Sequence, residues 1–162
     1  MIEIVEFTPP YQQQVIELIL DIQKNEFHVP ITLGDQPDLL VIPSFYQNEK
    51  GNFWIAIEEE KVIGTIALLS FSDDQAALRK MFVAKNYRGK EFGTAQKLFD
   101  ALLSWAKEKD IHEIYLGTLS HMLAAQSFYR RNGFVEIRKE ALPVRYPVMH
   151  VDSMFFRKTI HR

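Results

Sequence analysis

Hydrophobic and polar positions along the chain predict an alternation of strands and helices. Residues 2–7 alternate apolar and acidic side chains, as a half-buried strand does, and two prolines then interrupt the strand. From Tyr11 to about Glu26 the apolar residues recur at helical spacing and form one stripe. The same two periods predict a short helix at 39–46, strands at 53–57, 62–69 and 76–83, a long helix from about 92 to 106, a strand at 114–119, a helix at about 122–132, and closing strands at 135–137 and 151–157. The predicted order is therefore β α α β β β α β α β β.

Two stretches that contain prolines are predicted as loops. Residues 27–40 combine two prolines with Gly34, which is typical of turns. A loop that rigid elements hold over a site often carries substrate specificity, and an ordinary connector explains the stretch equally well. Residues 142–148 contain two further prolines, and a loop there could cover an acceptor site. Tyr146, Arg145 and Arg79 would suit an acceptor with a carboxylate, although surface packing explains them equally well.

The turn within residues 83–95 joins an apolar strand to the long amphipathic helix. The first N–H groups of a helix are unpaired and lie at the positive end of the helix dipole. Arg88 and Lys90 add positive charge to this turn, so the sequence predicts an anion site that suits phosphate. Glu91 is expected in the first helical turn, with its side chain directed outward. The alternative is an ordinary turn with surface charges.

Composition limits the classes of function. The chain has 162 residues, 47% of them hydrophobic, and is predicted to form one domain over residues 1–162. Nineteen Lys and Arg against 21 Asp and Glu give no global attraction for nucleic acid or for an anionic membrane. Cysteine is absent, which excludes disulfides and thiolate nucleophiles and suits a reducing cytoplasm. The acidic start carries no secretion signal and no apolar stretch could span a bilayer, so a soluble, cytoplasmic protein is expected.

Metal sites and several common catalytic motifs are not indicated. The 5 histidines have no paired metal-ligand spacing, and no metal is predicted. A Gly-x-Ser-x-Gly run is absent. The Gly89-Lys90-Glu91 run lacks the hydroxyl that would hold magnesium in a nucleotide-binding phosphate loop.

The glycine-containing turn resembles a motif of the GNAT superfamily of N-acetyltransferases. Residues 83–95 read Val-x-x-x-Tyr-Arg-Gly-Lys-x-Phe-Gly-Thr-Ala, which is similar to the superfamily's pyrophosphate loop for acetyl-coenzyme A (acetyl-CoA), Arg/Gln-x-x-Gly-x-Gly/Ala. Arg88 and Gly93 match this pattern, and Glu91 replaces its first glycine.

A second motif of the same superfamily follows in the expected order. Ala125-x-x-Phe128-Tyr129-x-x-x-Gly133-Phe134 is similar to Ala-x-x-x-Tyr-x-x-x-Gly-Phe, and Met122 stands where an Asn is usual. The resemblance extends over roughly residues 50–137. It implies an α/β fold with a mixed, twisted β-sheet flanked by helices.

The resemblance also implies roles for particular residues. The backbone of Met81, Phe82 and Val83 would lie along the pantetheine arm and direct an N–H group at the thioester oxygen. The pyrophosphate would be held by Arg88, Gly89, Lys90, Glu91, Phe92, Gly93 and Thr94. Tyr129 matches the tyrosine beside the sulfur, and a phenol of pKa about 10 can protonate a thiolate of similar basicity. The alternative for Tyr129 is a core tyrosine with a satisfied hydroxyl.

The implied function is direct transfer of an acetyl group from acetyl-CoA to a primary amine of a small molecule or peptide. A non-catalytic acyl-CoA sensor or interaction module on the same fold is the alternative, and a homodimer is left open. The sequence does not identify the general base. The candidates are Asp73, Asp74, Glu58, His121 and Asp152, each of which is also explained as a surface or turn residue.

Overall fold

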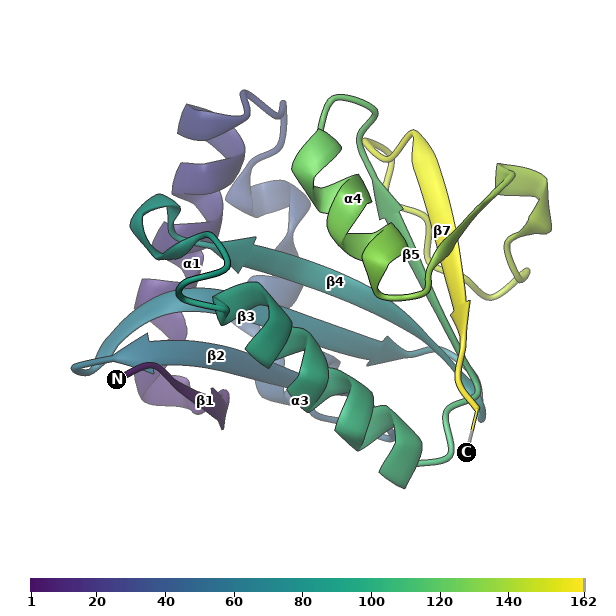
Figure 1. Ribbon diagram of the computed structural model, residues 1–162, viewed down its shortest axis with the longest axis horizontal. Helices are drawn as coiled ribbons and strands as arrows, with labels where there is room; N and C mark the ends of the chain where they lie inside the picture. Colours follow the sequence, from purple (N-terminus) through teal and green to yellow (C-terminus); the bar gives the residue numbers. More distant parts are fainter. Residues whose placement is uncertain (162) are drawn as a thin grey trace.

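The computed structural model describes residues 1–161, which form a mixed sheet with helices on both faces (Figure 1). The sheet has 7 strands in the order β1-β2-β3-β4-β5-β7-β6. The main elements are β1 (Glu3–Glu6), α1 (Gln12–Leu20), α2 (Ile42–Phe45), β2 (Asn52–Glu58), β3 (Lys61–Ser70), β4 (Gln75–Val83), α3 (Thr94–Glu108), β5 (Glu113–Thr118), α4 (Leu123–Arg131), β6 (Val135–Ile137) and β7 (Met154–Thr159). Short helical segments are η1 (Pro9–Tyr11), η2 (Asp21–Glu26), η3 (Leu33–Asp35), η4 (Pro37–Leu40), η5 (Lys85–Tyr87) and η6 (Lys139–Ala141). The predicted fold class and order of main elements are confirmed.

The two central strands separate partway along their length. Strands β1 to β4 are antiparallel neighbours, and β5 joins β4 in parallel. Pairing runs from Gln75 to Ala77 of β4 against Glu113 to Tyr115 of β5, and the strands then diverge (Figure 1). Ligands of α/β proteins bind beyond the carboxyl ends of parallel strands, and the divergence opens such a place between β4 and β5.

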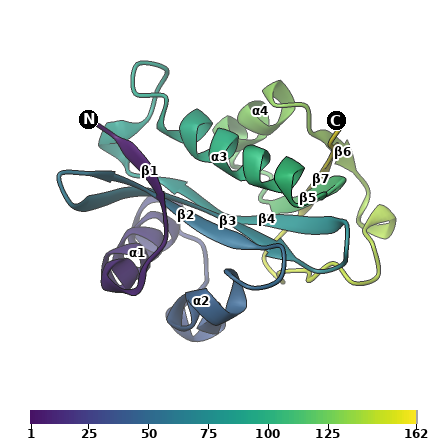
Figure 2. The ribbon, with the colours of Figure 1, turned by 90° about the horizontal axis from the view of Figure 1, so that it is seen from below.

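Helices cover both faces of the sheet, so its central strands carry apolar side chains on both sides. Helices α3 and α4 lie over one face, and α1 and α2 lie over the other (Figure 2). Trp54 and Ala56 of β2 belong to the core beneath α3, whereas Phe53 and Ile55 belong to the core beneath α1. This alternation is what a strand covered on both faces requires. Within residues 1–161, no helix has the length and apolar character needed to cross a membrane.

Strand β4 contains a bulge where it borders the divergence. Thr65 of β3 pairs with Phe82 of β4. Ala67, two residues further along β3, pairs with Arg79, so β4 holds one extra residue in this interval. Lys80 within the bulge has a φ of 53°, which non-glycine residues rarely adopt. The Thr65 hydroxyl donates a hydrogen bond of 2.6 Å to the Lys80 carbonyl and so supports this backbone.

Several element boundaries differ from the sequence prediction. The short helix predicted at 39–46 is confined to α2 from Ile42 to Phe45, because residues 37–40 form the separate turn η4. The first helix leaves the α-helical form after Leu20 and continues as the π-helix η2. Helix α3 begins at Thr94 and not at 92, because Gly93 caps it with a left-handed φ of 63°. Strand β7 begins at Met154 and not at 151, because the Asp152 N–H donates to the Met149 carbonyl at 3.1 Å and closes a turn.

Candidate active site

A cavity of about 620 Å³ lies where β4 and β5 diverge. It is lined by residues of η2, β4, β5, α4 and the segment before β7. Arg88 of the predicted anion turn shares this cavity with Tyr129 of α4 and with Asp152 of the segment before β7. The cavity therefore joins the two sequence motifs in one space.

The predicted coenzyme residues fall into two groups. Those that line the cavity are Met81, Phe82, Val83, Arg88 and Gly89. Those that form the adjoining turn and the start of α3, outside the lining, are Lys90, Glu91, Phe92, Gly93 and Thr94. Gly89 of the first group is followed directly by Lys90 of the second, so a ligand that extends from the cavity would pass onto the turn.

The N-terminus of α3 presents backbone N–H groups without a side-chain cap. Gly93 is the capping residue and carries no side chain that could accept from them. The Thr94 hydroxyl donates a hydrogen bond of 3.0 Å to the Tyr87 carbonyl. A Cβ on Gly93 would have Lys97 Cε as its nearest non-adjacent atom, at 4.0 Å, so the space above the turn is open. This geometry suits an anion such as pyrophosphate.

Glu91 lies in the turn that precedes α3. The expectation that it occupies the first helical turn is wrong, because α3 begins three residues later in the chain, at Thr94. The Glu91 side chain is exposed, with Oε1 3.9 Å from the place a Cβ on Gly89 would take. The carboxylate therefore lies beside the turn that is predicted to bind phosphate.

Arg88 is held by other parts of the protein. Its Nε donates to the Val83 carbonyl at 2.8 Å, and Nη2 donates to Glu26 Oε1 at 2.7 Å. Nη1 donates to the other carboxylate oxygen of Glu26. The hydrogen bonds from Arg88 lower the pKa of the Glu26 carboxyl below its usual value. A guanidinium has five N–H donors, so part of the donor set of Arg88 is not used by these contacts.

Tyr129 forms part of the buried wall of the cavity. Its side chain is 7% exposed, and its ring packs against Phe134 and Phe156 at centroid distances of 5.8 and 6.0 Å. Burial and, to a smaller extent, the carboxylate of Asp152 raise the pKa of Tyr129 above the usual value for a phenol. The hydroxyl therefore stays protonated at neutral pH and can act as a donor.

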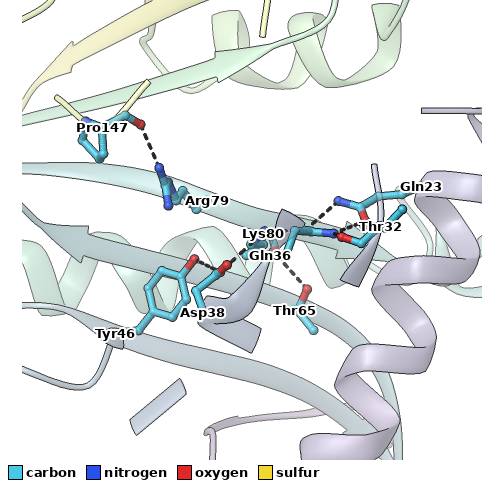
Figure 3. A network of polar contacts seen from close by, with 9 residues as sticks. All are labelled: Gln23, Thr32, Gln36, Asp38, Tyr46, Thr65, Arg79, Lys80 and Pro147. Atoms are coloured by element: carbon cyan, nitrogen blue, oxygen red, sulfur yellow. Dashed lines mark hydrogen bonds and ion pairs between the residues drawn. The ribbon is translucent and has the colours of Figure 1, made fainter. Parts of the chain in front are cut away.

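A buried polar network connects the loop before α2 to the bulge of β4 (Figure 3). Lys80 Nζ donates to Gln36 Oε1 at 2.5 Å and lies 3.6 Å from Asp38 Oδ2. The Tyr46 hydroxyl donates to the same Asp38 oxygen at 2.6 Å, and Gln23 and Gln36 exchange amide hydrogen bonds. The side chains of Lys80 and Asp38 are 4% and 9% exposed, and burial lowers the pKa of Lys80. Sequence analysis did not identify this network.

The residues proposed for a carboxylate-bearing acceptor are not all at the cavity. Arg79 and Tyr146 line it, whereas Arg145 is exposed and lies outside the lining. Arg79 Nη2 donates to the Pro147 carbonyl at 2.7 Å (Figure 3). The buried Nε of Arg79 has no hydrogen-bond partner within the described part of the chain.

The candidate bases are separated by the fold. His121 and Asp152 line the cavity. Asp73 and Asp74 lie in the exposed turn between β3 and β4. Glu58 lies at the end of β2, 3.6 Å from the N-terminal ammonium group. Two of the five candidates therefore remain in reach of a bound substrate.

Comparison with known proteins agrees with this geometry. The sequence model of the acetyltransferase (GNAT) family matches residues 16–134, most of the chain. The chain belongs to this family. Members of the GNAT family are acetyl-CoA-dependent N-acetyltransferases, and the co-substrate assigned by this membership is acetyl-CoA.

Similar GNAT proteins include solved and curated examples. The crystal structure of a GNAT-family acetyltransferase from Staphylococcus aureus Mu50 has a TM-score of 0.94 and 42% identity, and the match covers 98% of this chain and 99% of that chain. The probable N-acetyltransferase camello of Xenopus tropicalis is 32% identical over 122 residues, which are 74% of this chain and 55% of that protein. The N-acetylaspartate synthetase of the same species is 32% identical over 129 residues, which are 77% of this chain and 47% of that protein. The chain thus spans about half the length of the curated relatives that it matches.

The turn of this GNAT chain fits the phosphates of acetyl-CoA. Gly89 and Gly93 have φ angles of 106° and 63°, which give the backbone a course that L-residues rarely follow. The uncapped amides of α3 and the charge of Arg88 provide donors for an anion. Glu91 stands where the motif has its first glycine. Its side chain is exposed and so leaves the backbone of the turn accessible.

Proposed function

We propose that this chain transfers the acetyl group of acetyl-CoA directly to a primary amine of a small molecule or peptide, with Tyr129 as the general acid. One observation carries the proposal: the cavity lined by Arg88 and Gly89 of the coenzyme motif is also lined by Tyr129. A turn that holds pyrophosphate and a buried proton donor thereby border the same space. A sensor of acyl-CoA would need the turn but not a phenol within that space.

The burial of Tyr129 fits a role as hydrogen-bond and proton donor to the departing sulfur. A thiolate in an apolar site has little water to stabilise its charge. A hydrogen-bond donor in such a site therefore stabilises the thiolate more strongly than the same donor would in water. The raised pKa of Tyr129 keeps the hydroxyl protonated at neutral pH, so it can donate a hydrogen bond to the sulfur, and it also makes the phenol a weaker acid than one of pKa about 10. Met81 and Phe82 beside the β4 bulge would lie along the thioester, and the disrupted ladder of the bulge favours a backbone N–H directed at the carbonyl oxygen.

The acceptor is proposed to carry an anionic group near its amine. Arg79 lines the cavity with a buried Nε that lacks a partner among residues 1–161, and guanidinium groups bind carboxylates well. The relative named N-acetylaspartate synthetase has a name that implies an amino acid acceptor. Both observations favour an amine that also bears a carboxylate, such as an amino acid or a peptide terminus near an acidic residue.

The test is a screen of amine acceptors with acetyl-CoA that measures release of free thiol and the mass of the product. The panel should pair each amino acid with its amide, so that the carboxylate is the only difference. Acetyl transfer with a preference for the free acids would support both parts of the proposal. Tight coenzyme binding by calorimetry, with no thiol release from any amine, would favour the sensor instead.

A further inference from the structure

We infer that Asp152 is the general base that accepts the proton of the acceptor nitrogen. The inference rests on the acetyl transfer proposed above and adds the proton acceptor that this reaction needs. Asp152 is the sole carboxylate among the described residues that line the cavity. The other cavity groups with ionisable side chains are basic or phenolic, or are the exposed His121.

The backbone fixes Asp152 against β5. The Asp152 N–H closes a turn on the Met149 carbonyl at 3.1 Å, and the Ser153 N–H donates to the Thr118 carbonyl of β5 at 2.9 Å. The Ser153 hydroxyl in turn accepts from the Ser120 N–H at 3.2 Å. Asp152 is thus held between two anchored positions, directly beside the carboxyl end of β5.

Gly117 provides the space that the carboxylate occupies. A Cβ built on Gly117 would lie 2.3 Å from Asp152 Oδ2 and 2.7 Å from its Cγ, distances at which the side chain must move. Gly117 also lines the cavity. The absence of a side chain at this one position of β5 therefore lets the carboxylate lie flat on the strand at the cavity wall.

The charged groups that face Asp152 come from several elements. Burial raises its pKa, and the cations Arg79 and Lys80 of β4 and His150 of its own segment oppose that rise, with the pKa reaching about 6. Besides burial, the charge of Asp152 raises the pKa values of the phenols of Tyr129 in α4 and of Tyr146. No hydrogen bond or ion pair within residues 1–161 engages the carboxylate, so it is free to accept a proton from a ligand.

The proposed step balances its protons and electron pairs. The nitrogen lone pair forms the C–N bond to the thioester carbonyl carbon, and Asp152 takes one proton from that nitrogen. The C–S bond then breaks, and the sulfur leaves with the proton of the Tyr129 hydroxyl. The proton on Asp152, relayed through the cavity, restores Tyr129.

Two acidic groups that contact residues of the cavity lining are already engaged. Glu26 forms a two-point contact with Arg88, and Asp38 is bound by Tyr46 and Lys80. His121 is the one other candidate base at the cavity, and its side chain is exposed. A group that must work away from bulk water is better supplied by Asp152.

The experiment compares pH profiles of kcat and of kcat/KM for the wild type, Asp152→Asn, His121→Asn and the control Asp73→Asn, whose side chain is 97% exposed in the turn between β3 and β4. The wild-type kcat/KM should rise through a pH near 6, since the base of the free enzyme must lose its proton to act. Asp152→Asn should lower kcat by about 10²- to 10⁴-fold and remove this rise, with coenzyme affinity unchanged. Asp73→Asn should keep both the rate and the profile to within about threefold, whereas His121→Asn, whatever its rate, should keep the rise near pH 6.

Gly117→Ala supplies a second variant that keeps the carboxylate but displaces it. Its kcat should fall at least about tenfold, and the double variant Gly117→Ala/Asp152→Asn should be no slower than Asp152→Asn alone. If Asp152→Asn retains the wild-type rate and pH profile, or if His121→Asn removes the profile, the inference is wrong. Failure of the wild type to acetylate any amine would instead overturn the proposed function.

Thermal melting separates a catalytic carboxylate from a structural one. An Asp has a pKa of about 3.9 when unfolded, and burial raises the folded value of Asp152 to about 6. The folded state therefore favours the protonated form, and the stability of the wild type falls as the pH rises from about 4 to 6. Asp152→Asn should melt several degrees higher than the wild type at pH 7.5, and at the same temperature at pH 4. A lower melting temperature at pH 7.5 would mark Asp152 as a structural group and overturn the inference.

Discussion

Arg88, the arginine of the coenzyme motif, is bound at two points by the carboxylate of Glu26. Glu26 ends the π-helix η2, which continues α1, so the contact ties the predicted pyrophosphate turn to the end of that helix. The Arg88 guanidinium also lies 5.9 Å above the ring of Phe27. The same Glu26 carboxylate orients Arg88 and competes for it, because pyrophosphate seeks the same donors.

Glu26→Gln should tighten coenzyme binding. Removal of one negative charge beside the turn lowers the repulsion of pyrophosphate, by about two- to tenfold in Kd at low salt and by less at high salt. Calorimetry with coenzyme A at two salt concentrations measures this effect. Weaker binding at both concentrations would contradict the prediction and show that Glu26 holds Arg88 in its binding position.

The Glu26 variant also has an expected dependence on pH. The folded pKa of Glu26 is lowered, so the ion pair stabilises the fold above the unfolded pKa of about 4.3 and is lost as the pH falls through the folded pKa. The side chains of the pair are 34% and 28% exposed, which limits its contribution to about 1 kcal/mol. The melting temperatures of the two proteins should therefore differ at pH 7 and converge in acid.

Gly93→Val should weaken coenzyme binding at least about tenfold. A branched side chain at a φ of 63° is strained, and it would occupy the open space above the uncapped amides of α3. The matched control is Gly133→Ala, which places a side chain at a φ of 89° outside the cavity. Both variants should lose about 1–2 kcal/mol of stability, and only Gly93→Val should lose affinity in calorimetry. Equal affinity in the two folded variants would remove Gly93 from the site.

The sequence predicted the elements that depend on local patterns. Residues 12–20 and 94–108 form helices because their apolar positions recur at helical spacing, and the central strands follow runs of apolar residues. The start of α3 was predicted two residues too early. Phe92 continues the apolar stripe of the helix, but Gly93 caps the helix with a left-handed φ, so α3 begins only at Thr94. Phe92 instead packs against Tyr87 at a centroid distance of 5.7 Å.

The features that depend on distant contacts could not be predicted in this way. Asp152 follows a His and a Val in an unremarkable turn, and only the approach of that turn to Gly117 brings its carboxylate to the cavity. Asp38 and Gln36 are polar residues of a kind typical of surface loops, yet both are buried against Lys80. The one local signal was a lysine inside the apolar strand 76–83, since a buried lysine requires partners.

Tyr129→Phe should lower kcat by about ten- to a thousandfold and leave coenzyme affinity nearly unchanged. The change removes the proton donor but keeps the ring that packs against Phe134 and Phe156. Tyr115→Phe is the control, because Tyr115 is 4% exposed and lies outside the cavity lining. Steady-state rates of thiol release together with calorimetry distinguish the roles. Normal turnover with weaker coenzyme binding would make Tyr129 a packing residue.

The buried pair of Lys80 and Asp38 leads to a prediction about stability. Removal of one partner of a buried ion pair leaves the other charge without compensation, which typically costs about 3–5 kcal/mol. Asp38→Asn leaves the amide able to accept from Tyr46 but removes the charge opposite Lys80. Its cost should lie near the lower end of that range, because Lys80 keeps the hydrogen bond to Gln36 and can lose its proton.

A double-mutant cycle tests whether this cost comes from the pair. Lys80→Met should destabilise the protein by about 3 kcal/mol, and Asp38→Asn/Lys80→Met should cost less than the sum of the single changes by about 1–3 kcal/mol, since neither charge is then left buried alone. Urea unfolding measures each free energy. Asp35→Asn, at an exposed acid of the same loop, is the control and should show no coupling with Lys80→Met. Lys80 lines the cavity, whereas its partner Asp38 does not. Asp38→Asn should therefore act on the acceptor site through Lys80, which raises the KM for the acceptor and leaves the Kd for coenzyme A constant. Additive costs in the cycle would show that the two side chains stabilise the fold independently, and the loop before α2 would then not be held to β4 through their charges.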